Sequence, residues 1–247
     1  MPHSGPARSL LPLPWTGDPS LLPLSAPQLR READAAPLLL LLCHDQALSP
    51  DRHTSLRALL SAEEVERLEA FHRPSDRDLF LLGRASLRQL LGLWLDQPAR
   101  SVAIHQGPHG KPFCPGGPQF NVSHSGSLIL LGLHAIRPMG VDVERQRPDL
   151  AWEPLARRVL GAEALAELLA LPAREQPTAF LAAWCQLEAR LKAEGFGFAG
   201  LQALHTASRH QADGPGDHWT VDVPDGYRAA AALAEVALAE VALAAPH

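Results

Sequence analysis

Three short strand-like segments stand close together in the middle of this chain, and they restrict what it can fold into. Residues 120–123, 128–134 and 141–144 have the length and the apolar or alternating pattern of β-strands. Turn-forming residues separate them at positions 125–126 and 138–140. The pattern therefore predicts three short strands joined by turns at the centre of the chain.

Helical patterns flank these strands on both sides. Ser61 and Glu64 form a capping box, which predicts the start of a short helix. Apolar residues then recur with helical spacing, which predicts a long amphipathic helix over 76–95. Beyond the strands we expect helices over 153–170 and 177–194, the second opened by a proline in its first turn.

Further strands are predicted nearer the two ends. The apolar run 38–43 is typical of a buried strand, and 101–106 alternates like a strand before a loop rich in proline and glycine over 107–118. Towards the carboxyl end we expect strands over 219–223 and from residue 227 onward. Helices and strands are thus mixed along the chain.

These patterns divide the chain into three parts. Residues 1–36 are rich in proline and aperiodic, so we expect a loose extension laid over the surface. We place one half of the protein at 37–139 and the other at 140–247. A five-residue motif is repeated over 233–242, and we interpret it as an extension of a terminal strand or helix.

Composition argues against several classes of protein. The 247 residues are enough for one large domain or two smaller ones. A net charge of −5 gives no overall footprint for nucleic acid, and no apolar run approaches the ~20 residues of a membrane-spanning helix. Cys43, Cys114 and Cys185 are far apart, which favours neither disulfides nor a zinc site. We therefore expect a cytoplasmic protein, acting as a monomer without nucleic acid or membrane partners.

Two carboxylates on one predicted strand suggest a metal site. Asp142 and Glu144 are two residues apart, so their side chains project from the same face of a strand. Paired carboxylate oxygens are ligands that Mg²⁺ takes when it also binds phosphate oxygens. The alternative is a solvated acidic pair on an edge strand.

The two lysines of the chain both fall in motifs suited to phosphate. The other 20 of its 22 basic residues are arginines. Lys111 follows Gly110, and Lys192 lies four residues after Glu188 on a predicted helix, so that Glu188 and Lys192 share a face with Trp184. Glu188 would then offer a third metal oxygen and Lys192 a compact charge for phosphate. An ordinary helix pair of glutamate and lysine remains the alternative.

A polar stretch over 121–125 combines an amide, hydroxyls and an imidazole at the end of a predicted strand. Such groups near a turn favour an anion cradle. Two alternatives are an Asx or Ser turn and a Ser–His nucleophile pair, although neither serine stands in the Gly-x-Ser-x-Gly elbow of a hydrolase.

In this order the motifs resemble those of the 4′-phosphopantetheinyl transferases, specifically the larger two-half type that modifies carrier proteins of peptide, polyketide and fatty-acid synthases. Looser similarity runs over 61–88 and reappears at 226–228. The matching stretches are residues 110–112, 120–125, 140–144 and 184–193.

The resemblance implies an α+β fold of two similar, pseudo-symmetric halves, each a small and mainly antiparallel sheet packed against helices. Coenzyme A would bind between them as co-substrate, with Mg²⁺ at the junction. Asp142, Glu144 and Glu188 would hold the metal.

The resemblance also assigns the phosphates of coenzyme A. Lys111 and Lys192 would contact the pyrophosphate. Ser123, His124 and Arg67 would bind the nucleotide end, including its 3′-phosphate.

The implied reaction transfers 4′-phosphopantetheine to a serine of an acyl or peptidyl carrier protein and releases adenosine 3′,5′-bisphosphate. Asp142, Glu188 and Lys192 are the expected catalytic residues, with Glu188 or a metal-bound water taking the serine proton. The chain departs from the family at Leu187, where lysine is usual, and at Glu64 and Phe80, where polar or basic contacts are common. A non-catalytic homologue that binds coenzyme A or a carrier protein is the alternative.

Overall fold

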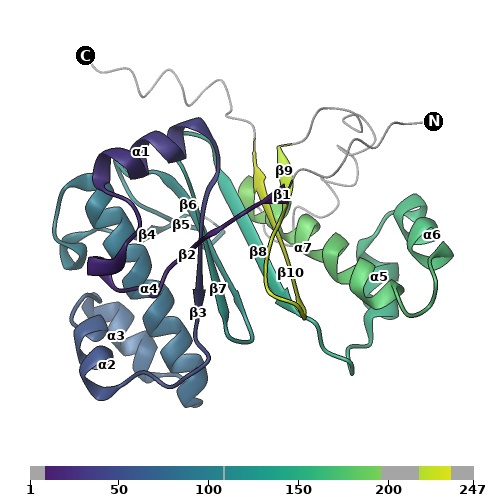
Figure 1. Ribbon diagram of the computed structural model, residues 1–247, viewed down its shortest axis with the longest axis horizontal. Coiled ribbons are helices and arrows are strands. Elements are labelled where there is room, and N and C mark those ends of the chain that lie inside the picture. Colours follow the sequence, from purple (N-terminus) through teal and green to yellow (C-terminus); the bar gives the residue numbers. More distant parts are fainter. Residues whose placement is uncertain (1–8, 108, 196–216, 235–247) are drawn as a thin grey trace.

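Two four-stranded sheets with helices outside them form the fold (Figure 1). A computed structural model describes residues 9–107, 109–195 and 217–234. The strand orders are β2-β3-β7-β6 and β1-β9-β10-β8. Helices α1 to α4 lie on one side of the paired sheets and α5 to α7 on the other.

The first sheet is built around a completely buried strand. β7 (Leu128–His134) pairs antiparallel with β3 (Leu38–Cys43) on one side and with β6 (Gln119–Ser125) on the other. The short β2 (Leu13–Pro14) adds to β3 in parallel. Because β7 is covered on both faces, its leucines and isoleucine form a continuous apolar run rather than an alternating one.

The second sheet uses strands from both ends of the described chain. β10 (Tyr227–Leu233) pairs antiparallel with β8 (Met139–Arg145) and with β9 (His218–Val221). β1 (Ser9–Leu10) joins β9 in parallel. A separate two-stranded ladder pairs β4 (His105–Gln106) with β5 (Pro112–Phe113).

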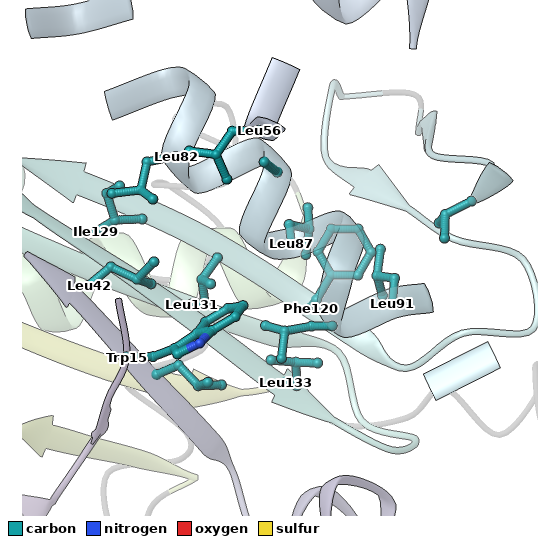
Figure 2. Close-up of a cluster of buried hydrophobic side chains, with 14 of the residues drawn as sticks. Trp15, Leu42, Leu56, Leu82, Leu87, Leu91, Phe120, Ile129, Leu131 and Leu133 are labelled. Atoms are coloured by element: carbon teal, nitrogen blue, oxygen red, sulfur yellow. The ribbon is translucent and has the colours of Figure 1, made fainter. Parts of the chain in front are cut away.

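Helices cover the outer face of the first sheet. The long α4 (Pro74–Leu95) packs there with α1 (Ala26–Ala35), α2 (Pro50–Arg57) and α3 (Ala62–Glu69), and 3-10 turns lie at Pro19–Leu21 and Ala99–Ser101. Figure 2 shows the core between them, with the leucines of α4 lying against alternate residues of β7. The labelled side chains are Trp15, Leu42, Leu56, Leu82, Leu87, Leu91, Phe120, Ile129, Leu131 and Leu133.

The other residues of β7 face the second sheet. Leu128 and Leu130 join a cluster with Val141 and Val143 of β8, so apolar side chains fill the space between the sheets. Asp142 and Glu144 alternate with these valines and project from the opposite face of β8. The long α7 (Gln176–Glu194) covers that face.

Two shorter helices complete this side. α5 (Trp152–Val159) and α6 (Ala162–Ala170) pack against α7 around Phe180. Among the described residues, no helix has the length and apolarity that crossing a bilayer would need.

The structure confirms the α+β class with two halves and most predicted elements. Strands 38–43 and 128–134 have their predicted bounds, and the capping box at Ser61 and Glu64 opens α3. The long helix starts at Pro74, two residues before its predicted start, and α7 begins one residue early. The division at 1–36, 37–139 and 140–247 stays a prediction.

Several predictions about local structure are wrong. The proline-rich start is not loose from residue 9 onward, because α1 buries Leu29 and Ala33 and the strands before it join both sheets. Only the end of 101–106 is a strand, and residues 139–140 belong to β8 rather than to a turn. The helix over 153–170 is broken between α5 and α6, while α2 was not anticipated. Most of the repeat over 233–242 lies outside the described residues.

Gly140 explains why β8 begins where a turn was expected. A Cβ at this position would overlap the carbonyl oxygen of Ala189 and the backbone nitrogen of Ala193 on α7. Ala230 and Ala232 of β10 pack in the same layer, so small residues on both surfaces bring the helix close to the sheet. The glycine marks a close helix–sheet contact rather than a chain reversal.

Replacing Gly140 tests this contact. Gly140→Ala should lower the free energy of unfolding by about 3 kcal/mol, because the methyl group forces α7 away from β8. Urea unfolding followed by circular dichroism measures the change. Gly83→Ala is the matched control: its Cβ would lie at an ordinary 3.4 Å from Ile129, so stability should stay within about 1 kcal/mol. Equal stabilities for the two variants would contradict the close approach.

Candidate active site at the seam between the sheets

Side chains of β6 bridge to the backbone of β8 where the two sheets meet. Both are edge strands of their own sheets. Three alternate residues of β6 accept hydrogen bonds from alternate backbone N–H groups of β8. The pairs are Val141 N to Asn121 Oδ1 at 3.0 Å, Val143 N to Ser123 Oγ at 3.3 Å, and Arg145 N to Ser125 Oγ at 3.1 Å. We call this set of contacts the seam.

Asp142 is the most buried charged group at the seam, with 3% of its surface exposed. Its Oδ1 accepts a hydrogen bond from Ser123 Oγ at 2.9 Å and pairs with the Lys192 ammonium at 2.6 Å. Lys192 also donates to Ser123 Oγ at 3.2 Å. Asp142 Oδ2 is buried and accepts no hydrogen bond from the described residues, although the Cys185 thiol, whose pKa burial and Asp142 raise, lies nearby. A buried carboxylate oxygen that accepts no hydrogen bond is costly, so the arrangement favours a further positive group.

Glu188 and Lys192 come from successive turns of α7. Desolvation raises the pKa of the Glu188 carboxyl; Lys192 opposes this shift, and the nearby carboxylates of Asp142 and Glu144 add to it. No hydrogen bond or ion pair holds Glu188 within the described ranges. Its carboxyl is therefore available to a ligand at the seam.

Glu144 is held by the next serine of β6. Ser125 Oγ donates to Glu144 Oε2 at 2.7 Å. Desolvation raises the pKa of Glu144, the hydrogen bond from Ser125 lowers it, and Asp142 raises it further. Three carboxyl groups thus share one electrostatic environment with a single ammonium, that of Lys192.

This donor set suits a hard divalent cation. All three candidate ligands are carboxylates, and Asp142 keeps a buried oxygen that accepts no hydrogen bond from the described residues. The described part of the chain holds no group of three His, Cys, Asp or Glu side chains gathered closely enough to hold an ion, and Lys192 pairs with Asp142. The chemistry of the residues fits Mg²⁺, although the carboxylates are not arranged as a coordination sphere.

A cleft of about 460 Å³ adjoins the seam on the outer side of β6. Asn121 belongs to both, because it lines the cleft while its Oδ1 accepts from β8. Arg67 of α3 and His124 of β6 line the same cleft. Desolvation and the Lys192 charge lower the pKa of His124, while Asp76 opposes the shift.

An aromatic ring supports the basic groups of the cleft. The guanidinium groups of Arg67 and Arg84 lie 5.2 and 5.9 Å from the centre of the Phe80 ring. Glu64 pairs with Arg84 at 3.5 Å and with the buried Arg88, in addition to capping α3. Glu64 and Phe80 therefore hold arginines in place, while Glu63 and Glu64 also bring negative charge to the lining of the cleft.

Lys111 contacts the carboxyl-terminal end of α7, next to Lys192. Its ammonium donates to the carbonyl oxygen of Ala193 at 2.9 Å, and it is not among the residues lining the cleft. Burial lowers the pKa of Lys111 to about 8, with Glu194 opposing the shift. The loop after β4 is thus tied to the helix that carries Glu188 and Lys192.

Two family profiles match consecutive stretches of this chain. Residues 47–135 match 4′-phosphopantetheinyl transferase, N-terminal, and residues 138–234 match the 4′-phosphopantetheinyl transferase superfamily. The chain belongs to the 4′-phosphopantetheinyl transferase superfamily. The boundary between the matched stretches falls immediately before β8, which begins at Met139.

Curated relatives carry the same family name. A Synechocystis sp. protein described by this transferase name (slr0495) is 36% identical over 58% of this chain and 60% of its own length. The 4′-phosphopantetheinyl transferase HetI of Nostoc sp. is 35% identical over 62% of this chain and 66% of its own. The AcpT transferase of Salmonella typhimurium is 40% identical over 36% of this chain and 47% of its own. The chain thus matches less than two thirds of the length of each of these relatives.

The structure places the expected transferase residues in three groups. Asp142, Glu144, Glu188, Lys192 and Ser123 meet at the seam. His124 and Arg67 line the cleft, whereas Lys111 lies at the end of α7. Ser123 faces Asp142 and not the cleft, so its expected contact with the nucleotide gains no geometric support.

Sequence reasoning does not reach all the residues of the candidate site. Arg84 lines the cleft, and its only signal in the sequence is a charged residue that interrupts the apolar stripe of the long helix. Ser125 belongs to the polar stretch 121–125, but the sequence does not indicate that it binds Glu144. Leu187, in place of the usual lysine of the family, packs against the cluster around Phe180. Its side chain serves the packing of α7.

The Lys111 ammonium should make stability depend on pH. In the folded protein it titrates at about 8, below its ordinary 10.5, so the unfolded chain binds more protons between these values. The buried ammonium of Lys111 therefore lowers the free energy of unfolding below pH ~8, and this loss is recovered as pH rises towards ~10.5. Wild type should gain stability relative to Lys111→Met across this window, as measured by urea unfolding at several pH values. Parallel curves for the two proteins would contradict the lowered pKa.

Proposed function

We propose that this chain transfers 4′-phosphopantetheine from coenzyme A to a serine of an apo acyl or peptidyl carrier protein, releasing adenosine 3′,5′-bisphosphate. The observation that carries the proposal is the pairing of Lys192 with Asp142 at 2.6 Å beside a buried carboxylate oxygen that accepts no hydrogen bond from the described residues. A cluster of charged groups that includes carboxyls with raised pKa values and lies next to a cleft is typical of a reaction site. The family and the names of the relatives support the same reaction.

The cleft suits a nucleotide-sized ligand. Its volume of about 460 Å³ falls in the ordinary range of small-molecule sites. Arg67 and Arg84, supported by Phe80, would hold the phosphate of the nucleotide end. His124, whose pKa is lowered, would bind there as a neutral hydrogen-bonding group. The pantetheine arm would then extend from the cleft towards the seam.

The residues of the seam would act on the pyrophosphate. Lys192 would turn from Asp142 to the phosphate oxygens, and Lys111 would add a second charge from the end of α7. Asp142, Glu144 and Glu188 would hold Mg²⁺, which when bound neutralises the charge that develops on the breaking pyrophosphate. Glu188 has a raised pKa and would accept the proton of the carrier serine.

We also propose that the protein acts in the cytoplasm as a monomer. Its three cysteines are free thiols, as expected in a reducing compartment. Size-exclusion chromatography with light scattering measures the oligomeric state.

Mass spectrometry tests the proposed transfer. The full chain is incubated with coenzyme A, Mg²⁺ and several apo carrier proteins, and one carrier should gain the mass of one phosphopantetheine. Asp142→Asn should slow this transfer at least ~100-fold while leaving the circular dichroism spectrum unchanged, because it removes a buried charge that faces Lys192. Asp149→Ala, at an exposed position, is the control and should keep full activity.

Two outcomes would contradict the proposal. Coenzyme A binding without transfer to any carrier would indicate a non-catalytic homologue. Full activity of Asp142→Asn would remove Asp142 from the reaction.

A further inference from the structure

Two serine hydroxyls at the seam each donate one hydrogen bond and accept another from the backbone of β8, and Ser123 also accepts one from Lys192. Ser123 donates to Asp142 and accepts from Val143 N, and Ser125 donates to Glu144 and accepts from Arg145 N. In both cases one hydroxyl joins a carboxylate and the next backbone N–H of β8. A hydroxyl can do this because it donates and accepts at once.

The choice of residue along β6 follows the acidic side chains of β8. Each side chain of β6 at the seam can be matched to the residue of β8 that precedes the N–H it accepts from. Ser125 is then matched to Glu144, Ser123 to Asp142, and Asn121 to Gly140. Asn121 only needs to accept from Val141 N, and its amide oxygen does so. A hydroxyl occurs where a carboxylate has to be oriented as well. Closing the seam alone would not require the donor that Ser125 directs at Glu144.

Ser125 is itself held from the second sheet. The next residue, Gly126, has φ +58°, and a Cβ there would overlap the hydroxyl oxygen of Tyr227. Tyr227 Oη accepts from Ser127 N at 3.1 Å and lies 3.3 Å from Ser127 Oγ. Tyr227 belongs to β10, which pairs with β8. The turn carrying Ser125 is thus fixed to the sheet that carries Glu144.

Among the described residues, Ser125 is also the only one that donates a hydrogen bond to the Glu144 carboxylate. Asp142 is oriented by both Ser123 and Lys192, whereas Glu144 has a single hydrogen bond at 2.7 Å to its Oε2. Without it, no hydrogen bond from the described residues would fix the side chain of Glu144, which is partly buried. The orientation of the second carboxylate therefore depends on Ser125.

We propose that Ser125 is a positioning residue: its hydroxyl holds the Glu144 carboxylate towards the cation site at the seam, and Tyr227 fixes the turn that carries it. The inference rests on the function proposed above, in which Glu144 is a metal ligand. Groups that orient a metal ligand commonly change metal affinity 10- to 100-fold when removed.

Metal binding without coenzyme A or carrier tests this role. Binding of Mn²⁺ to the full chain is followed by electron paramagnetic resonance for wild type, Ser125→Ala, Ser125→Thr and Tyr227→Phe. Ser125→Ala should raise the dissociation constant about 10-fold, and Ser125→Thr should restore it to within about threefold because the hydroxyl is kept. Tyr227→Phe should shift it in the same direction by a smaller factor. Ser55→Ala, whose hydroxyl bonds only to the carbonyl of Asp51 on α2, is the matched control and should bind like wild type.

Urea unfolding of the same variants separates positioning from stability. Unchanged Mn²⁺ affinity in Ser125→Ala, with or without a loss of stability, would overturn the proposal. So would a wild-type chain that binds no Mn²⁺. Failure of the transfer assay alone, with the expected order of Mn²⁺ affinities, would refute the proposed reaction and leave the role of Ser125 intact.

Discussion

The close contact between α7 and the second sheet determines the rest of the site. Gly140 leaves room for the backbone of Ala189 and Ala193, and a larger residue at that point of β8 would force the helix away. Because the helix approaches so closely, the ammonium of Lys192 reaches the buried Asp142, two residues further along β8. Removing this carboxylate from water is costly, and only a short contact of opposite charge offsets the cost. The small residues of the interface therefore decide whether the charged ones can meet.

The site also depends on how the edge strands of the two sheets, β6 and β8, meet. A continuous backbone ladder between β6 and β8 would satisfy both strands, but it would leave no side chain between them. Instead, hydroxyl and amide groups of β6 accept from β8, so each edge is covered and the acidic side chains stay in contact with polar groups. The apolar face of β8 is buried between the sheets, where Val141 and Val143 pack with Leu128 and Leu130 of β7. Polar chemistry and packing thus occupy opposite faces of β8.

The sequence predicted the elements best where the signal was local. The apolar run 38–43 and the capping box at Ser61 specify their structures within a few residues, and the spacing of Asp142 and Glu144 correctly places both on one face. Partners distant in sequence were beyond this reasoning. Nothing near Lys111 indicates that its ammonium bonds to the end of α7, and the glycine at 140 looked like a turn because its partner lies about fifty residues away. Two-residue strands likewise form only through pairing with remote segments.

The first described residues form a strap across the molecule, since β1 pairs with the second sheet and β2 with the first. Ser9 pairs with Thr220, so this contact closes a loop of almost the whole chain. During synthesis the strap is made well before its partner β9. Contacts of such long sequence separation form slowly, because most of the chain has to be ordered before they become favourable. The two halves can thus gather their own cores early, and the strap fastens them together only as a late step of folding.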